Sequence, residues 1–130
     1  MPSHVPPAGV WCPSITIFDP VTDKVDLENQ ARYFRYLSTT GLAGLVVLGT
    51  NAETMLLTRE ERKALIATAR RAVGPSFPIM AGVGAHSTTQ TLEFISDAAT
   101  AGADSVLVLP NAYFGTFSVS QCRQLARCID

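Results

Sequence analysis

A small polar turn directly after an apolar run is the feature of this chain best suited to hold an anionic ligand. Residues 44–48 carry no polar side chain and are followed by Gly49, Thr50 and Asn51. A glycine followed by a hydroxyl and an amide gives a tight turn in which several donors converge without bulky side chains. Such a turn can bind a carboxylate, but Thr and Asn also satisfy their own backbone in ordinary turns. From the turn alone, the ordinary turn is the favoured interpretation.

Acid–base and nucleophilic groups near this turn are few. Glu53 could act as an acid or a base, but we expect its carboxylate to hold the loop by accepting backbone N–H groups. The sequence contains two lysines, Lys24 and Lys63, and their contexts predict a loop and a helix. The chain therefore offers no amine nucleophile at a predicted strand end.

A second candidate is the segment Gly82-Val83-Gly84, which leads into a helix start at Ser87. A strand, a Gly-x-Gly turn and a helix N-terminus resemble a dinucleotide-binding loop. However, Ser87 stands at the place of the third glycine, and residues 108–110 offer no acidic residue to a ribose. We expect both glycines to serve close packing at a strand end.

Other side chains near strand ends have weaker claims. Tyr113 follows a strand end and a proline, where a phenol could relay a proton or bind a substrate hydroxyl. The alternative is a packing anchor with its hydroxyl in water. His86 is expected to be a loop or rim residue, and Trp11 and Phe18 are expected to pack in the core or at the end of a barrel.

The elements that position these residues alternate along the chain. Apolar patterns predict strands over 10–17, 45–48, 78–81 and 105–109, and capping and periodicity predict helices over 26–39, 58–73, 87–101 and from 118 onward. Apolar strands joined by helices predict a parallel sheet with its strands buried on both faces. Residues 16–18, 49–53, 82–86 and 110–114 then meet at its carboxyl edge, where such folds place their sites.

Length and composition narrow the fold class. The chain has 130 residues, 47% of them hydrophobic and 16% charged. Four βα units are half of a (β/α)8 barrel, which takes about 250 residues. We therefore expect a flexible leader over 1–8 and the N-terminal half of a TIM-barrel domain over 9–130. A doubly wound sheet and a self-contained four-stranded open sheet are the alternatives.

Charge and cysteine content exclude several function classes. The net charge is −1 and the charges are scattered, which gives no basic stripe for nucleic acid. The longest apolar stretch is too short to span a membrane, and the N-terminus has no secretory pattern. Cys12, Cys122 and Cys128 have neither disulfide nor zinc spacing. We expect no cofactor or metal, and a cytoplasmic location with the mitochondrion also compatible.

Taken together, these segments resemble the dihydrodipicolinate synthase/N-acetylneuraminate lyase family of class I aldolases. Residues 44–53, followed by 57–62, are similar to that family's Gly-(Ser/Thr)-x-Gly-Glu signature and its following helix. Residues 81–88 and 108–114 resemble the third- and fourth-strand segments, and the match runs from about Gly9 to the end. Ala52 stands where the signature has glycine. Ala112 stands where the commonest fourth-strand tyrosine lies, with Tyr113 one place on.

The resemblance implies a (β/α)8 barrel, a homo-oligomer built from tight dimers, and a pyruvate-like 2-oxo acid bound as an imine on a sixth-strand lysine. By carry-over, Thr50 and Asn51 hold the substrate carboxylate and the Thr50 hydroxyl joins a proton relay. Tyr113, one place beyond the family's fourth-strand tyrosine, is the second catalytic candidate. The imine-forming lysine lies beyond Asp130, so we expect an inactive fragment. The Thr-Asn pair favours 4-hydroxy-2-oxoglutarate or 2-keto-3-deoxy sugar-acid aldolases.

Two alternatives come from other function classes. A half-barrel has unpaired strand edges, so it could act as a non-catalytic module that binds a partner or oligomerises. A small flavodoxin-like domain that binds a nucleotide is the weaker alternative.

Overall fold

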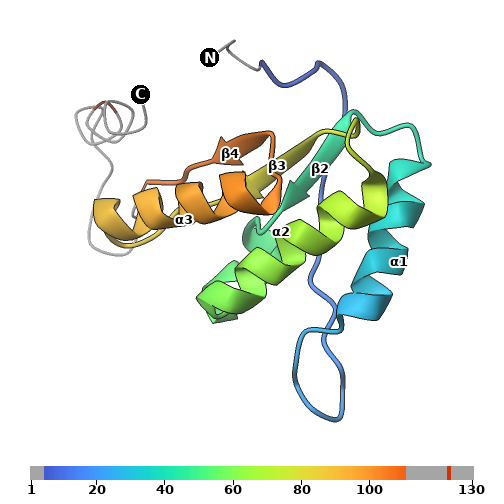
Figure 1. Ribbon diagram of the computed structural model, residues 1–130, viewed down its shortest axis with the longest axis horizontal. Helices are drawn as coiled ribbons and strands as arrows, with labels where there is room; N and C mark the ends of the chain where they lie inside the picture. The colour runs from blue at the N-terminus through green and yellow to red at the C-terminus, as the bar shows by residue number, and fades with distance from the viewer. Residues whose placement is uncertain (1–4, 111–122, 124–130) are drawn as a thin grey trace.

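A four-stranded parallel sheet, covered by three helices, forms the described part of the chain. Figure 1 shows the helices lying against the sheet. The structure is a computed structural model that describes residues 5–110 and residue 123. Tyr113, Cys122, Cys128 and the helix expected from residue 118 lie outside these residues. The elements are β1 (Trp11–Pro13), α1 (Leu27–Ser38), β2 (Gly44–Val47), the 3₁₀-helices η1 (Thr50–Ala52) and η2 (Thr54–Leu56), α2 (Arg59–Val73), β3 (Ile79–Gly82), α3 (Thr88–Ala101) and β4 (Ser105–Leu107).

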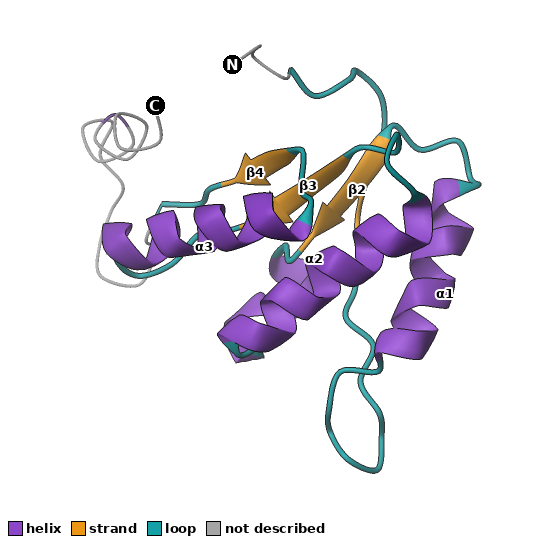
Figure 2. Ribbon diagram, viewed as in Figure 1, coloured by secondary structure: helices purple, strands orange, loops and turns teal. Residues whose placement is uncertain are grey.

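The strand order identifies the kind of α/β fold. The strands lie in the order β1-β2-β3-β4, and every neighbouring pair is parallel. The three helices cover the same face of the sheet (Figure 2). A doubly wound sheet has helices on both faces and a strand order that reverses direction. That alternative, and with it the flavodoxin-like domain, is therefore wrong for residues 5–110.

The hydrophobic core lies between the sheet and the helices. Leu45 pairs with Ile79, and Val47 with Ala81, and all four side chains are at most 2% exposed. Side chains alternate along a strand, so the residues between them, Val46 among them, face the opposite side. There they are only half-buried, and Leu107 is 37% exposed. The expectation of strands buried on both faces is thus wrong within the described residues, because no described helix covers this second face.

Predicted caps fix where the helices begin. The Thr58 hydroxyl accepts the Glu61 N–H and the Glu61 carboxylate accepts the Thr58 N–H, which confirms a capping box at the start of α2. The Ser87 hydroxyl accepts the Gln90 N–H at the start of α3. Helix α2 thus begins after the two 3₁₀-helices that follow β2, and α3 begins after a short loop that follows β3. Of the helices described, none has the length and apolar character needed to cross a bilayer.

Strand β1 is shorter than the predicted 10–17. Beyond Pro13, the Ser14 N–H still donates to the Val46 carbonyl at 3.0 Å. After Ser14, the fully buried side-chain amide of Gln30 takes the place of strand-to-strand hydrogen bonds. It accepts from the Ile17 N–H at 2.8 Å and donates to the Ile15 carbonyl at 3.0 Å. A helix side chain thus satisfies backbone groups that a longer strand would pair.

Candidate functional site

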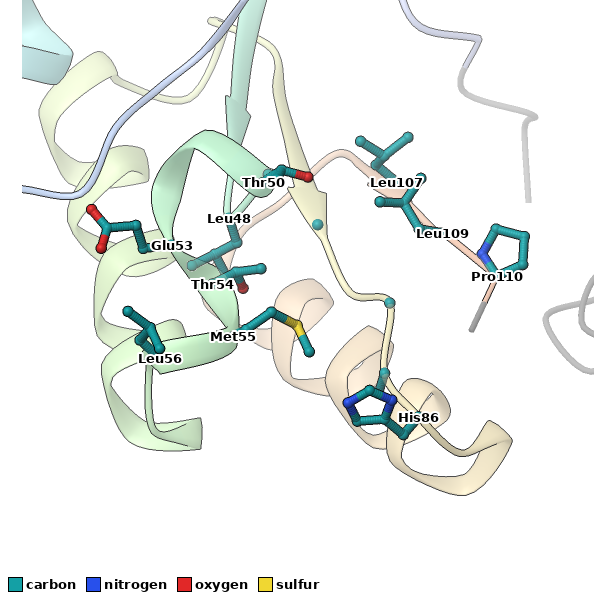
Figure 3. Close-up of a pocket in the computed structure, with 14 residues that line it drawn as sticks. Leu48, Thr50, Glu53, Thr54, Met55, Leu56, His86, Leu107, Leu109 and Pro110 are labelled. Atoms are coloured by element: carbon teal, nitrogen blue, oxygen red, sulfur yellow. The ribbon is translucent and has the colours of Figure 1, made fainter. Parts of the chain in front are cut away.

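A cavity of about 550 Å³ opens at the carboxyl ends of β2, β3 and β4 (Figure 3). Most of its lining is apolar or glycine, with Thr50, Glu53, Thr54 and His86 as the polar members. The other lining residues are Leu48, Gly49, Met55, Leu56, Gly82, Gly84, Ala85, Leu107, Leu109 and Pro110. Three of the four segments predicted to meet here do contribute. Residues 16–18 do not line the cavity.

The Thr50 turn, defined as residues 48–53, takes the chain from β2 into the cavity rim. Leu48 has a left-handed backbone (φ 64°) although its side chain is only 2% exposed. Gly49 is extended, and Thr50 begins η1. The Thr50 side chain is exposed, and in Figure 3 its hydroxyl is directed toward the end of β3. The sequence therefore places a hydroxyl donor at the cavity, as predicted.

Backbone donors accompany this hydroxyl. The N–H groups of Ala52 and Glu53 donate to the carbonyls of Gly49 and Thr50 at 3.1 Å each. The N–H groups of Thr50 and Asn51 have no acceptor within the described residues. The Asn51 side chain is exposed and is not part of the cavity lining. Any role of Asn51 at the cavity therefore rests on its backbone N–H.

Glu53 does not have the role expected from the sequence. Its side chain is exposed, and Figure 3 shows its carboxylate directed away from Thr50 and Met55. Within the described residues, this carboxylate accepts no hydrogen bond, so the predicted loop-holding role is wrong. What Glu53 contributes is its left-handed backbone (φ 54°), which joins η1 to η2. Ala52 carries no positive φ, so it fits where the family signature has glycine.

Close backbone packing explains the two glycines of the third strand end, as predicted. A Cβ on Gly82 would lie 2.0 Å from the Leu48 carbonyl oxygen. A Cβ on Gly84 would lie 3.0 Å from the Leu109 carbonyl oxygen and 3.1 Å from the Leu109 nitrogen. The ends of the three strands can approach one another only because these side chains are absent.

Thr16 anchors the Thr50 turn from the side of β1. Its hydroxyl donates to the Ala52 carbonyl at 2.7 Å, and its side chain is 7% exposed. The sequence placed Thr16 at a strand end but gave no sign of this contact, which joins residues 36 positions apart.

We expect Thr16→Val to destabilise the protein by about 1–3 kcal/mol, because a buried carbonyl loses its donor while the side-chain volume is kept. Urea unfolding measures this loss. Thr100→Val is the matched control: its exposed hydroxyl donates to the Ser96 carbonyl within α3, and its removal should change stability little. Equal effects of the two substitutions would contradict an anchoring role for Thr16.

Arg62 is a buried residue beside the cavity. From the sequence alone it is only the last residue of the segment 57–62 that follows the signature, with no role assigned to it. It is 6% exposed, and its guanidinium donates to the Gly82 carbonyl at 2.9 Å and to the Thr54 hydroxyl at 2.7 Å. The guanidinium carbon lies 4.1 Å from the centre of the Phe94 ring. Burial lowers the pKa of Arg62 from its ordinary value. The ordinary value is so high that the group stays charged.

The remaining predicted groups stand apart from the cavity centre or outside the described residues. His86 is exposed and lines the cavity, which confirms a rim position. Lys24 lies in a loop and Lys63 in α2, and neither lines the cavity. Tyr113 lies outside the described residues. No group of three or more His, Cys, Asp or Glu residues able to hold a metal ion occurs in the part of the chain that the structure describes.

Comparison with known proteins agrees with this geometry. The model of the dihydrodipicolinate synthetase family matches residues 6–129. A protein of Coccidioides immitis (strain RS), provisionally named a mitochondrial 4-hydroxy-2-oxoglutarate aldolase, is 67% identical over 115 residues, which are 88% of this chain and 37% of that protein. An L-threo-3-deoxy-hexylosonate aldolase of Hypocrea jecorina is 36% identical over 112 residues, or 83% of this chain and 36% of the aldolase.

Solved structures give the same picture of the fold. A protein from Coccidioides immitis, provisionally assigned to the dihydrodipicolinate synthase family, superposes with a TM-score of 0.91 at 58% identity, covering 99% of this chain and 42% of that one. A monomeric dihydrodipicolinate synthase variant superposes with a TM-score of 0.84 at 30% identity, covering 93% and 39%. The chain thus spans about two fifths of each relative, and the expected fold, a half-barrel of the (β/α)8 class, is confirmed.

Proposed function

Because the chain belongs to the dihydrodipicolinate synthetase family, we propose that it supplies the carboxylate-binding part of a Schiff-base aldolase acting on pyruvate-derived 2-oxo acids. One observation carries the proposal. The Thr50 side chain lines the cavity where the parallel strands end, and within the described residues the N–H groups of Thr50 and of its neighbour Asn51 have no acceptor. A carboxylate is the acceptor that such a set of donors fits.

In this proposal the residues have distinct roles. Thr50 and Asn51 bind the keto-acid carboxylate, and the Thr50 hydroxyl also takes part in proton transfer, with Tyr113 as a second proton-transfer group. The electrophilic carbonyl carbon must react with an amine, and neither Lys24 nor Lys63 lines the cavity. The imine-forming amine therefore comes from a part of the enzyme outside residues 1–130. Residues 1–130 alone should bind a keto acid at most, without cleaving it.

The names of the relatives narrow the substrate class. Two of the relatives are named as 4-hydroxy-2-oxoglutarate aldolases, and another is named as an L-threo-3-deoxy-hexylosonate aldolase. Both substrate types are 4-hydroxy-2-oxo acids whose retro-aldol cleavage releases pyruvate. We propose this class for the complete protein, with 4-hydroxy-2-oxoglutarate as first choice. The two fungal 4-hydroxy-2-oxoglutarate aldolases are named as mitochondrial, which agrees with one of the two expected locations.

A second function has one observation in its favour. The sheet face that carries Val46, Met80 and Leu107 has no cover among the described residues, and both outer strands have an unpaired edge there. Such surfaces bind other chains. Residues 1–130 could therefore act as a non-catalytic oligomerisation module. Size-exclusion chromatography separates the two functions, because a folded monomer of residues 1–130 would contradict the module.

The aldolase proposal predicts a covalent adduct that depends on the whole protein. Incubation of the complete protein with pyruvate and borohydride should reduce the imine and trap pyruvate on a lysine, which mass spectrometry locates. Residues 1–130, and the complete protein carrying Lys63→Arg as a control, test the amine assignment. We expect no adduct on the former and an undiminished adduct on the latter. A pyruvate adduct on Lys24 or Lys63 would refute the proposed source of the amine.

A further inference from the structure

Arg62 is a buried cation that has no carboxylate partner among the described residues. Removing a guanidinium from water is costly unless hydrogen bonds satisfy it. Here the acceptors are neutral: the Gly82 carbonyl, the Thr54 hydroxyl and, at 3.3 Å, the Thr54 carbonyl. The Phe94 ring supplies its negatively polarised face on another side. A charge kept buried at this cost calls for a specific role.

Both segments that Arg62 bonds belong to the cavity lining. Gly82 ends β3, and Thr54 begins η2, directly after the Thr50 turn. Gly82 in turn packs against the carbonyl of Leu48, and Leu48 is the residue whose left-handed backbone starts the Thr50 turn. Two sets of contacts therefore run from the guanidinium to the Thr50 turn, one through Gly82 and Leu48 and one through Thr54.

Arg70, which is also in α2, is a suitable comparison because its contacts are structural and lie away from the cavity. Its guanidinium donates to the carbonyls of Gly102 at 2.9 Å and Phe77 at 2.9 Å and pairs with Asp104. These residues precede β3 and β4, at the amino ends of the strands, and none lines the cavity. The two arginines thus make similar numbers of bonds to backbone carbonyls at opposite ends of the sheet.

We propose that Arg62 is a positioning residue for the 2-oxo-acid site, holding Gly82 and Thr54 so that the Thr50 hydroxyl and the N–H groups of Thr50 and Asn51 converge on one carboxylate. This inference rests on the proposed aldolase function. The planar guanidinium suits the task, because it donates along fixed directions to two segments at once. Arg62 touches no substrate in this role and acts only through its neighbours.

The test compares Arg62→Met with Arg70→Met in the complete protein. Both substitutions should lower Tm, because each leaves buried carbonyls without a donor. Only Arg62→Met should raise KM for 4-hydroxy-2-oxoglutarate, by about tenfold or more, since misplacing binding groups by even a fraction of an ångström weakens the site. At a temperature well below both Tm values, Arg70→Met should keep the parental KM.

Arg62→Lys provides a second, milder variant. Lysine keeps the positive charge but cannot donate to Gly82 and Thr54 in the same fixed geometry. Its KM should therefore stay clearly above the parental value. Full recovery of KM by lysine, or an equal rise of KM in Arg70→Met, would overturn the positioning role. An inactive parental protein would instead refute the aldolase function, so the two failures are distinguishable.

Discussion

Gly82→Ala is expected to force apart the ends of β2 and β3 and to abolish most of the site's activity. The added methyl group would lie 2.0 Å from the Leu48 carbonyl oxygen and 2.7 Å from its carbon. These are backbone atoms, which cannot turn aside as a flexible side chain can. Overpacking of this kind costs about 1–3 kcal/mol, and a backbone clash belongs at the upper end. Both the free energy of unfolding, measured with urea, and kcat/KM should decrease when they are measured on the complete protein.

Gly49→Ala is the matched stability control, since it makes the same chemical change within the same turn. A Cβ there would lie 3.8 Å from the nearest atom, a methyl of Val46, and the backbone φ is −74°. Alanine adopts this conformation freely and reduces the freedom of the unfolded chain, so stability should stay equal or rise by about 0.4–1 kcal/mol. If Gly82→Ala proved as stable as Gly49→Ala, the close approach of β3 to Leu48 would be refuted.

Thr50→Val is expected to separate catalysis from stability. Valine keeps the shape of threonine but has no hydroxyl, and the Thr50 side chain is exposed, so the unfolding midpoint should not change. A hydrogen bond to a charged group contributes about 1.5–3 kcal/mol. The loss of one to the substrate carboxylate should lower kcat/KM roughly ten- to hundredfold. Steady-state kinetics with 4-hydroxy-2-oxoglutarate measures the effect.

Thr50→Ser is the companion variant. Serine restores the hydroxyl without the methyl group, so it should recover most of the lost kcat/KM. If Thr50→Val retained full kcat/KM, the Thr50 hydroxyl could be neither a carboxylate ligand nor a proton-transfer group. If serine failed to rescue the activity, the methyl group rather than the hydroxyl would be the feature that matters.

Local chemistry made much of this fold predictable from the sequence. The Thr58–Glu61 capping box and the glycines that end helices act over three or four residues, and the helices and strands that they predict within residues 5–110 are present. The cavity at the strand ends followed from parallel pairing, which places every βα turn at one edge. Thr50 could be found because its donors are its own side chain and its own backbone.

The parts that sequence reasoning missed depend on contacts between distant segments. The bond from Thr16 to Ala52 spans 36 residues and that from Arg62 to Gly82 spans 20, and no local pattern marks either one. Glu53 was expected to hold the loop because carboxylates commonly accept backbone N–H groups. In the folded chain its left-handed backbone turns the side chain to solvent, and Thr16 anchors the loop from another strand. The early end of β1 likewise depends on a distant residue: Gln30, in α1, makes the hydrogen bonds to the backbone of Ile15 and Ile17 that a neighbouring strand would otherwise make.

The sequential strand order has a consequence for how the polypeptide acquires its structure. Strands β2, β3 and β4 each pair with the strand that precedes them in the chain, and each of the three helices contacts the strand that follows it. Paired residues lie 25 to 34 positions apart, so each pairing closes a single βα unit, and the entropy cost of closure is the same kind of cost for each unit. Each βα unit can therefore dock on its predecessor as soon as it leaves the ribosome, and the nascent chain grows its sheet one strand at a time from the amino terminus.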